Sequence, residues 1–555
     1  MADRFWADKY PEGVSHEINY DKYATVIDVF NDSCKRFASS PAYSNLGVTI
    51  TYGQLDTLSA QFASFLEHHT NLKKGDRIAV QMPNLIQFPI VVFAALRAGL
   101  IVVNTNPMYT AREMEHQFND SGAKALVVLA NFGDLVEQVI PKTGVETVIV
   151  TQIADMHKPL KRKLLNFVIK KVKKMVPEFS IPGAIDFTKA MALGKKKAFK
   201  SSHAPAAEDI AVLQYTGGTT GVAKGAMLTH KNLVANMLQM KSVLTDFKEG
   251  KEIMITPLPM YHIFSFTVGC LGMMETGAHN ILITNPRDIP AFVKEMSKWK
   301  FTGVMGLNTL FVAMLNNKDF KNLDFSQLKI TVAGGMALQK TAADDWEKVT
   351  GCKVCEGYGM TETSPVISVN PPANIQIGTI GIPMPGTDVI LLDEDENEVA
   401  IGERGELCVK GPQVMKGYWQ LPEATAETMT KDGEWLKTGD VAVFQEDGFL
   451  KIVDRIKDMI LVSGFNVYPN EIEDVLCSHP EVIEAAAVGV SDEKSGEAVK
   501  VFVVAKSKNL TKEMVVDHCK RNMTGYKVPR HVEFRDDLPK TNVGKILRRE
   551  LRDAS

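Results

Sequence analysis

The sequence predicts an α/β protein with a large N-terminal domain of layered sheets and helices and a small α+β domain at its C-terminal end. Its 555 residues are too many for one hydrophobic core, because cores stop growing beyond roughly 250 to 300 residues. Helical and strand-like segments alternate along the first part of the chain, which favours mainly parallel sheets packed between helices. The pattern changes after a polar, charged turn at 454–457. We therefore expect two domains, at residues 1–454 and 455–555.

The individual elements follow from the spacing of apolar residues. The first clear helix begins at Thr51, and its apolar residues recur at helical spacing up to Leu66. A turn then precedes a strand, and a second helix and three short strands continue the alternation. We place the strands at 78–82, 101–103, 125–129 and 148–150 and the second helix at 90–97. After the domain boundary, strand-like runs at 485–490 and 499–505 lie among helical segments, as in a small α+β domain.

Residues 158–175 predict a basic amphipathic helix. Eight Lys or Arg and no acidic residue occur within 158–174, while apolar residues recur at helical spacing between Pro159 and Pro177. Two interpretations are open. The helix is either a surface helix with its apolar side packed on the domain, or a docking site for an anionic membrane surface. The apolar residues of the pattern are Leu160, Leu164, Val168, Val172 and Met175.

The composition excludes some classes of function. The chain is 45% hydrophobic and 23% charged, as in an ordinary globular protein. Its net charge of −3 provides no positive field for a phosphate backbone, so we do not expect a nucleic-acid partner. Seven scattered cysteines and a polar N-terminus without an apolar signal segment indicate a cytoplasmic location. The apolar stretch 88–103 contains Pro89 and Arg97, which favours a buried helix and strand over a membrane span.

A run rich in threonine and glycine, at 215–225, follows the strand-like segment 210–213. Glycines allow the backbone to bend tightly, so that N–H groups and threonine hydroxyls can face phosphate oxygens, and Lys224 adds a positive charge. The spacing differs from that of a Walker A loop. The predicted phosphate-binding residues are Thr216, Gly217, Gly218, Thr219, Thr220, Gly221 and Lys224.

This run resembles the phosphate-binding signature of the acyl-adenylate-forming (AMP-binding) superfamily, which includes acyl-CoA synthetases, luciferases and peptide-synthetase adenylation domains. Further motifs of the superfamily follow in the same order between Thr51 and Arg549. The resemblance implies an enzyme that uses ATP and Mg²⁺ to make an acyl adenylate and then transfers the acyl group to CoA. It also implies a β-barrel-like subdomain within the N-terminal domain and a mobile C-terminal domain.

The segment 356–362, EGYGMTE, resembles the adenine and magnesium motif of the superfamily. By this resemblance Tyr358 stacks on adenine, Thr361 contacts the α-phosphate and Glu362 holds Mg²⁺. A metal ion is needed because the departure of pyrophosphate concentrates negative charge on phosphate oxygens. Asp440, in the segment WLKTGD, would accept hydrogen bonds from both ribose hydroxyls. The other residues that we place around ATP or AMP are Gly335, Glu356, Gly357, Ile452 and Arg455.

The segment 538–546, LPKTNVGKI, resembles the motif that carries the adenylation lysine. The Lys545 ammonium would bridge the attacking carboxylate and the α-phosphate, which orients the nucleophile and stabilises the transition state. The resemblance further implies that the small domain rotates about a hinge at Lys457 and withdraws Lys545 before the thiol arrives. The residues that this rotation would bring to CoA are Ser463, Gly464 and Phe465.

The segment 257–266 falls where the superfamily lines its acyl pocket. His262 occupies the position of an aspartate that amino-acid-activating relatives use for the substrate amine. Without that acid an amino acid would bury an unpaired ammonium, which disfavours amino acids as substrates. The acyl-pocket candidates are Tyr261, Phe264, Phe266, Gly303 and Gly306, and the catalytic candidates are Lys545, Thr216 and His262.

Taken together, the motifs most resemble those of bacterial long-chain fatty acid:CoA ligases. An aryl or hydroxycinnamate:CoA ligase and a luciferase-like oxygenase are the alternatives, because they share the nucleotide motifs. Each buried methylene contributes about 0.8 kcal/mol, so a long acyl chain would bind without polar recognition. The expected partners are a fatty acid, ATP, CoA, the inner face of the cell membrane through 158–175, and a second copy of the chain in a homodimer.

Overall fold

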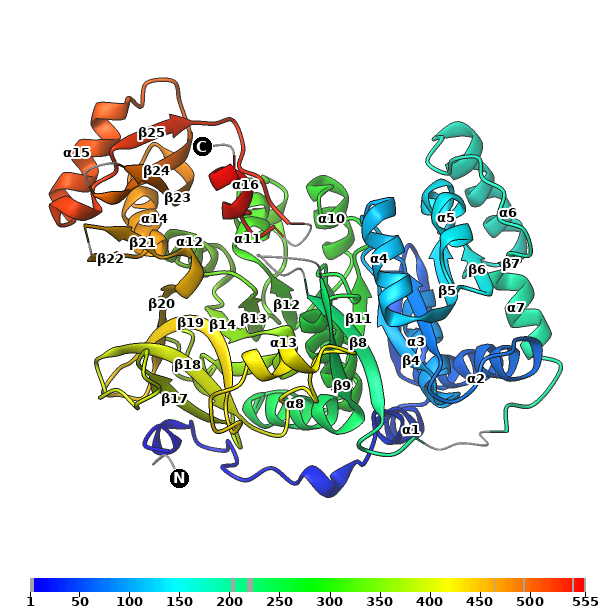
Figure 1. Ribbon diagram of the computed structural model, residues 1–555. Coiled ribbons are helices and arrows are strands. Elements are labelled where there is room, and N and C mark those ends of the chain that lie inside the picture. The colour runs from blue at the N-terminus through cyan, green and yellow to red at the C-terminus, as the bar shows by residue number, and fades with distance from the viewer. Residues whose placement is uncertain are drawn as a thin grey trace.

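The computed structural model describes residues 4–200, 205–216, 223–463, 465–492, 495–541 and 544–553. In these residues helices and strands alternate to form three sheets in the body of the molecule and a fourth in a smaller C-terminal domain, which stands above the body (Figure 1). The predicted α/β class with a smaller α+β domain is confirmed. The expected boundary after residue 454 falls within strand β20 (Leu450–Arg455), the last strand of the third sheet.

A seven-stranded sheet lies in the N-terminal part and is parallel except for its last pair of strands. Its inner strands are rich in Val, Ile and Ala and are buried on both faces, as is typical of a parallel sheet covered by helices. In order across the sheet, the strands are β7 (Ile185–Asp186), β6 (Thr147–Thr151), β5 (Ala123–Leu129), β3 (Arg77–Gln81), β4 (Ile101–Asn104), β8 (Ile210–Thr216) and β9 (Lys224–Thr229).

The helices around this sheet confirm the predicted alternation. The helix expected from Thr51 begins at Tyr52, because the Thr51 side chain caps it by accepting a hydrogen bond from the Gln54 backbone N–H. One face of the sheet is covered by α1 (Val26–Arg36), α2 (Tyr52–His69) and α3 (Gln87–Arg97). The opposite face is covered by α4 (Ala111–Ser121) and α5 (Gly133–Val139).

A nine-stranded sheet forms the centre of the body, with five consecutive parallel pairings between β1 and β14 and antiparallel strands at both ends. One face packs on α10 (Ile289–Met296), α11 (Asn308–Leu315) and α12 (Lys340–Thr350). The other faces α8 (His230–Val243), a π-helix (Ser265–Gly272) and α9 (Met273–Glu275). Its strands, in order, are β16 (Ile382–Pro383), β15 (Val366–Val369), β14 (Val354–Gly359), β13 (Ile330–Gly334), β12 (Gly303–Gly306), β10 (Ile253–Thr256), β11 (His279–Leu282), β1 (Pro41–Asn45) and β2 (Val48–Thr51).

The remaining two sheets are smaller. The expected barrel-like subdomain corresponds to a four-stranded antiparallel sheet of β17 (Asp388–Leu392), β18 (Arg404–Lys410), β19 (Leu436–Phe444) and β20. In the C-terminal domain the predicted strands are the antiparallel pair β23 (Val482–Asp492) and β24 (Gly496–Ala505), whose sheet is completed by β21 (Ile460–Val462), β22 (Phe465–Val467) and β25 (His531–Phe534). Its helices are α14 (Pro469–Cys477), α15 (Lys512–Asn522) and α16 (Arg548–Asp553).

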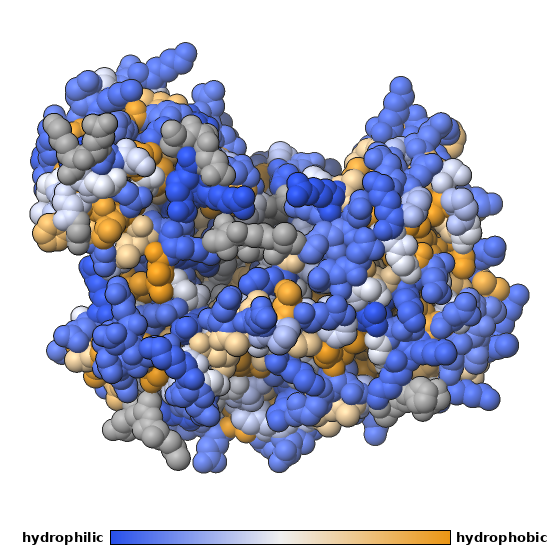
Figure 2. All heavy atoms as spheres, in the orientation of Figure 1, coloured by the Kyte–Doolittle hydropathy of each residue, from blue (hydrophilic) through white to orange (hydrophobic). Residues whose placement is uncertain are grey.

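The basic helix forms where the sequence predicts it, as α6 (Pro159–Phe167) and a π-helical turn at 168–172. It lies on the surface as the first interpretation expects, but four of the five apolar residues of the pattern, Leu160, Leu164, Val172 and Met175, are exposed and do not pack on the domain. None of its residues is buried, and the side chains of Leu160, Leu164 and Phe167 are 86%, 63% and 59% exposed. Figure 2 shows apolar residues among charged ones over this lobe of the molecule. No helix within the described ranges is both long and apolar enough to cross a membrane.

Candidate functional site

A cavity of about 1730 Å³ opens where the two large sheets, the antiparallel sheet and the C-terminal domain come together. Figure 2 shows this face of the molecule hollowed between the C-terminal domain and the opposite lobe. Side chains from β8, β14, β19 and the segment 540–549 line the same space, although they are far apart in the sequence. The predicted residues that line it are Thr216, Lys224, Tyr261, His262, Phe264, Gly335, Gly357, Tyr358, Thr361, Glu362, Asp440, Arg455, Lys457 and Lys545.

Both ends of the predicted phosphate loop open into this cavity. Thr216 is the last residue of β8 and Lys224 is the first of β9, and the two are paired in the antiparallel register. The His116 ring is held against the exit of the loop, with Nε2 3.0 Å from the carbonyl oxygen of Ala223. The two ends of the loop are therefore held by the pairing of β8 with β9. The predicted residues Gly217, Gly218, Thr219, Thr220 and Gly221 lie outside the described ranges.

Tyr358, Asp440 and Arg455 form one group in the wall of the cavity, joined by a hydrogen bond and an ion pair. The Tyr358 hydroxyl donates to Asp440 Oδ2 at 2.5 Å, and the Arg455 guanidinium Nε lies 3.0 Å from Oδ1 of the same carboxylate. Asp440 and Arg455 are opposite each other on β19 and β20, so the backbone fixes their separation. Burial raises the pKa of Tyr358, which keeps its hydroxyl a donor. The group presents an aromatic face and an oriented carboxylate side by side.

Glu362 lies in a short 3-10 turn, Thr361–Thr363, and its carboxylate is buried. Its Oε1 accepts a hydrogen bond of 2.6 Å from the Tyr418 hydroxyl, whereas no other side chain among the described residues bonds to Oε2. The described residues contain no cluster of three His, Cys, Asp or Glu suited to a metal ion. Magnesium typically binds one or two protein carboxylates together with substrate phosphates and waters, so a single carboxylate with one open oxygen fits it.

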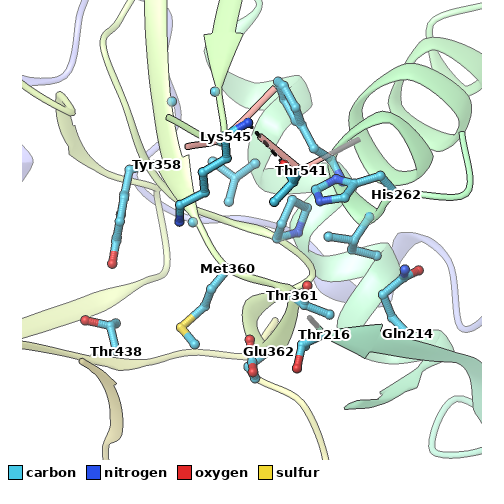
Figure 3. A pocket seen from close by; sticks show the side chains of 18 of the residues that line it. Gln214, Thr216, His262, Tyr358, Met360, Thr361, Glu362, Thr438, Thr541 and Lys545 are labelled. Carbon is cyan, nitrogen blue, oxygen red and sulfur yellow. Dashed lines mark hydrogen bonds between the residues drawn. The ribbon is translucent and has the colours of Figure 1, made fainter. Parts of the chain in front are cut away.

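His262 faces the cavity from the segment between β10 and the π-helix (Figure 3). Burial, assisted by the charge of Lys545, lowers the pKa of His262 to about 4, so the ring is neutral at neutral pH. Its Nδ1 accepts a hydrogen bond from the Phe264 backbone N–H at 3.3 Å. A neutral imidazole that accepts at Nδ1 carries its proton on Nε2 and can donate it to an oxygen of a bound carboxylate.

Lys545 extends into the cavity between Tyr358 and His262 (Figure 3). A tight hairpin presents it: its backbone N–H donates to Thr541 Oγ1 at 3.0 Å and its carbonyl accepts from the Thr541 N–H at 2.7 Å. Burial and the nearby Arg455 lower the pKa of Lys545 to about 8. The preceding Gly544 has a φ of +83° and approaches α11 so closely that a Cβ atom there would lie 2.8 Å from Thr309 Oγ1.

The cavity continues away from these polar groups as an apolar channel across one face of the nine-stranded sheet. Ile330, Val332 and Gly334 alternate along β13 and all line it, as do Cys355 and Gly357 on β14. Four residues of strand correspond to about 13 Å of channel. Its other lining residues are Met240, Val243, Leu244, Met254, Leu258, Val268, Met273, Leu307, Val366, Val369 and Met384, of which Leu258 lies in the predicted acyl-pocket segment 257–266.

Several predicted residues lie elsewhere. Phe266 is fully buried in the core, and Gly303 and Gly306 are on β12 behind Met254 and Phe311, so none of the three lines the cavity. Ile452 and Glu356 also lie outside the lining. The Glu356 carboxyl accepts from the Leu338 N–H at 3.2 Å, and burial raises its pKa to about 8. Ser463 and Phe465 are exposed on the C-terminal domain away from the cavity, and Gly464 is outside the described residues.

Comparison with known proteins identifies the relatives of this chain. A family model described as AMP-binding enzyme matches residues 30–419, and one for the AMP-binding enzyme C-terminal domain matches residues 471–545. The long-chain-fatty-acid–CoA ligase of Escherichia coli O157:H7 is 54% identical over 99% of this chain and 98% of its own, and that of Haemophilus influenzae is 50% identical over the same shares. The ATP-bound structure of MatB from Rhodopseudomonas palustris superposes with a TM-score of 0.83 and 27% identity, covering 96% of this chain and 99% of its own.

Proposed function

We propose that this chain, which belongs to the family of AMP-binding enzymes, is an AMP-forming acyl-CoA synthetase for long-chain fatty acids. It converts a fatty acid, ATP and CoA into acyl-CoA, AMP and diphosphate through an acyl adenylate. The observation that carries the proposal is the cavity, in which the nucleotide residues and Lys545 stand at one end of a long apolar channel. An aryl acid would fill only the part of the channel nearest the polar groups, which disfavours the aryl-ligase alternative.

The nucleotide binds with adenine against Tyr358 and with its ribose hydroxyls on Asp440. Arg455 holds that carboxylate in place from the neighbouring strand. Thr216 and Lys224 reach the phosphates from the two ends of the loop. Glu362 offers its open oxygen to Mg²⁺, which would neutralise charge that develops on the departing diphosphate.

In the first half-reaction a carboxylate oxygen of the fatty acid attacks the α-phosphorus, and the bond from that phosphorus to the diphosphate oxygen breaks. The Lys545 ammonium lies where it attracts both the carboxylate and the α-phosphate, and so it favours the crowded, negatively charged transition state. His262, neutral and protonated on Nε2, orients the carboxylate by a hydrogen bond. The acyl chain lies in the channel and keeps water away from the reacting atoms.

The second half-reaction needs a different arrangement, because Lys545 and its hairpin fill the space beside the acyl carbon. The C-terminal domain rotates about Lys457, which follows β20, and withdraws the hairpin. In the arrangement described here the Lys457 carbonyl accepts from Arg552 at 3.2 Å, and Lys457 lines the cavity. The rotation brings Ser463, Gly464 and Phe465 to the pantetheine of CoA. The exposed Phe465 ring, stacked on Tyr526 at 4.9 Å, supplies an apolar surface for that contact.

The test is diphosphate exchange into ATP and thioester formation by the purified protein with Mg²⁺, ATP and CoA. The acids are a series from short to long fatty acids, with coumarate alongside. We expect kcat/KM for the acid to rise with the length of its acyl chain. A preference for coumarate would favour the aryl-ligase alternative, and a protein that exchanges no diphosphate with any acid would refute the proposed function.

We also propose that the enzyme works in the cytoplasm and docks on the inner face of the cell membrane through α6 and the turn that follows. Leu160, Leu164 and Phe167 are exposed together on a helix whose charged residues are all basic. The helix is tied to the domain through the opposite side, where the Asn166 side chain donates to Asp155 Oδ1 at 3.2 Å and accepts from the Ala154 N–H at 3.1 Å. A lipid surface rich in anionic headgroups satisfies both the apolar and the basic residues.

Flotation with liposomes tests this docking. Changing Lys170, Lys171, Lys173 and Lys174 to Gln should weaken binding to anionic vesicles, and Leu160→Ser with Leu164→Ser should weaken it at any salt concentration. The matched control changes the exposed lysines of another segment, Lys195, Lys196 and Lys197, to Gln. Equal binding by all variants would reject the helix as the membrane anchor.

A further inference from the structure

A tyrosine that no sequence motif singled out touches two of the groups assigned above. The hydroxyl of Tyr418 donates to Glu362 Oε1 at 2.6 Å, and the ammonium of Lys224 lies 5.0 Å from the centroid of the Tyr418 ring. Tyr418 is only 6% exposed and lines the cavity. One buried ring therefore contacts both a carboxylate suited to Mg²⁺ and a lysine at the end of the phosphate loop.

The segment around this tyrosine is fastened to the same two parts of the site. The Met415 N–H donates to the Glu362 carbonyl at 2.7 Å, which holds the 3-10 turn of Glu362. On the other side the Met227 N–H donates to the Gly417 carbonyl at 2.9 Å, and the Trp419 N–H donates to the Gly225 carbonyl at 2.8 Å. Met227 and Gly225 belong to β9, the strand that leaves the phosphate loop. Residues 415–419, which we call the brace, thus join that strand to the carboxylate turn.

We propose that Tyr418 is a positioning residue that holds Glu362 and Lys224 in register, so that the carboxylate, which would hold Mg²⁺, and the lysine ammonium face the same part of the cavity. The inference rests on the proposed function. The phenol occupies Oε1 and restrains the carboxylate, so that Oε2 would be the oxygen offered to the metal. Loss of a partner group that orients a metal-binding side chain typically lowers the metal affinity by about 10- to 100-fold. The ring face attracts the ammonium and limits the directions that the long Lys224 side chain takes.

The two contacts can be separated by substitution. Tyr418→Phe removes the hydroxyl and keeps the ring beneath Lys224, whereas Tyr418→Leu removes both. The matched control is Tyr10→Phe, which also deletes a phenol hydrogen bond, the 2.7 Å bond to the Pro383 carbonyl, at a residue outside the cavity lining. The control should leave nucleotide and metal binding unchanged.

Two measurements test the proposal. In diphosphate exchange, Tyr418→Phe should raise the Mg²⁺ concentration that gives half the maximal rate by about tenfold. This is the order expected for the loss of one hydrogen bond to a charged group. The rate at saturating Mg²⁺ should stay close to that of the unchanged protein. In calorimetry, ATP should bind Tyr418→Phe normally in EDTA but gain less affinity when Mg²⁺ is added. Tyr418→Leu should weaken ATP binding in EDTA as well, because Lys224 loses its support.

These measurements distinguish failure of the positioning role of Tyr418 from failure of the proposed function. If the unchanged protein catalyses no exchange, the proposed function is refuted. If it does, and Tyr418→Phe has the Mg²⁺ dependence of the control, the positioning role is refuted. A loss of ATP affinity in Tyr418→Phe that is equal with and without Mg²⁺ would also overturn it, because a general effect on packing would act in both conditions alike.

Discussion

The approach of Gly544 to α11 offers a way to impair one half-reaction and spare the other. Alanine at this position would place its Cβ 2.8 Å from Thr309 Oγ1, well inside the ordinary contact distance of about 3.5 Å. If the C-terminal domain rotates as proposed, that contact exists only while the hairpin is docked with Lys545 in the cavity. Relief requires the hairpin to move by several tenths of an ångström, and Lys545 is the next residue. A misplacement approaching 1 Å in a positioned group costs about 100-fold in rate.

A second cost of Gly544→Ala has a different signature. The φ of Gly544 is +83°, a region where a residue with a side chain costs about 1 to 2 kcal/mol. This strain is internal to the hairpin and is present in both domain arrangements, so it lowers the stability of the C-terminal domain without favouring either one. We therefore expect a modest fall in Tm, a loss of about 100-fold in diphosphate exchange, and near-normal thioester formation from supplied acyl-AMP and CoA.

The companion substitution Thr309→Ala removes the atom that the new Cβ would meet. Alone it should leave both half-reactions unchanged, since Thr309 does not line the cavity. Combined with Gly544→Ala it should restore much of the exchange rate while the lower Tm remains. Equal losses in both half-reactions, or an exchange rate that Thr309→Ala does not restore, would refute the docking geometry.

Lys545→Ala should abolish most diphosphate exchange and leave thioester formation from supplied acyl-AMP nearly intact, and equal losses would contradict its assignment to the first step. Because burial lowers the pKa of Lys545 to about 8 and only its charged form is active, kcat/KM for ATP should fall as pH rises through about 8, whereas a flat profile would argue against an essential ammonium. Val332→Phe narrows the channel about two strand residues beyond Gly334, so it should reduce kcat/KM for long acids far more than for short ones; a uniform loss would place the acyl chain elsewhere.

The polar half of the site could be predicted from the sequence because each motif is local. Tyr358 and Glu362 lie four residues apart on one strand end and the turn after it, and such spacing survives folding whatever the rest of the chain does. The parallel sheets were also predictable, since their strands are continuous apolar runs. The motifs and the apolar strands could be predicted because each depends only on residues that are close together in the sequence.

The apolar half could not be predicted in the same way. The channel is assembled from α8, the π-helix and four strands, and each lining residue looks like an ordinary core residue in its own segment. The glycines that the sequence suggested, Gly303 and Gly306, instead make room for the side chains of Met254 and Phe311. The role of Tyr418 could not be predicted from the sequence for a related reason, because its partners Glu362 and Lys224 lie 56 and 194 residues away in the chain.

The layout of the cavity separates two kinds of binding energy. With the proposed function, the acyl chain would make the same apolar contacts before and during the attack on the α-phosphorus, because the reacting atoms would lie at the far end of the channel from Ile330 and Met254. Interactions that are equal in the ground state and the transition state lower KM without raising kcat. The contacts that change during reaction belong to Lys545, His262 and the groups that hold the phosphates. Chain length should therefore govern KM, at about 0.8 kcal/mol for each methylene, while kcat is set by the polar groups at the mouth of the channel.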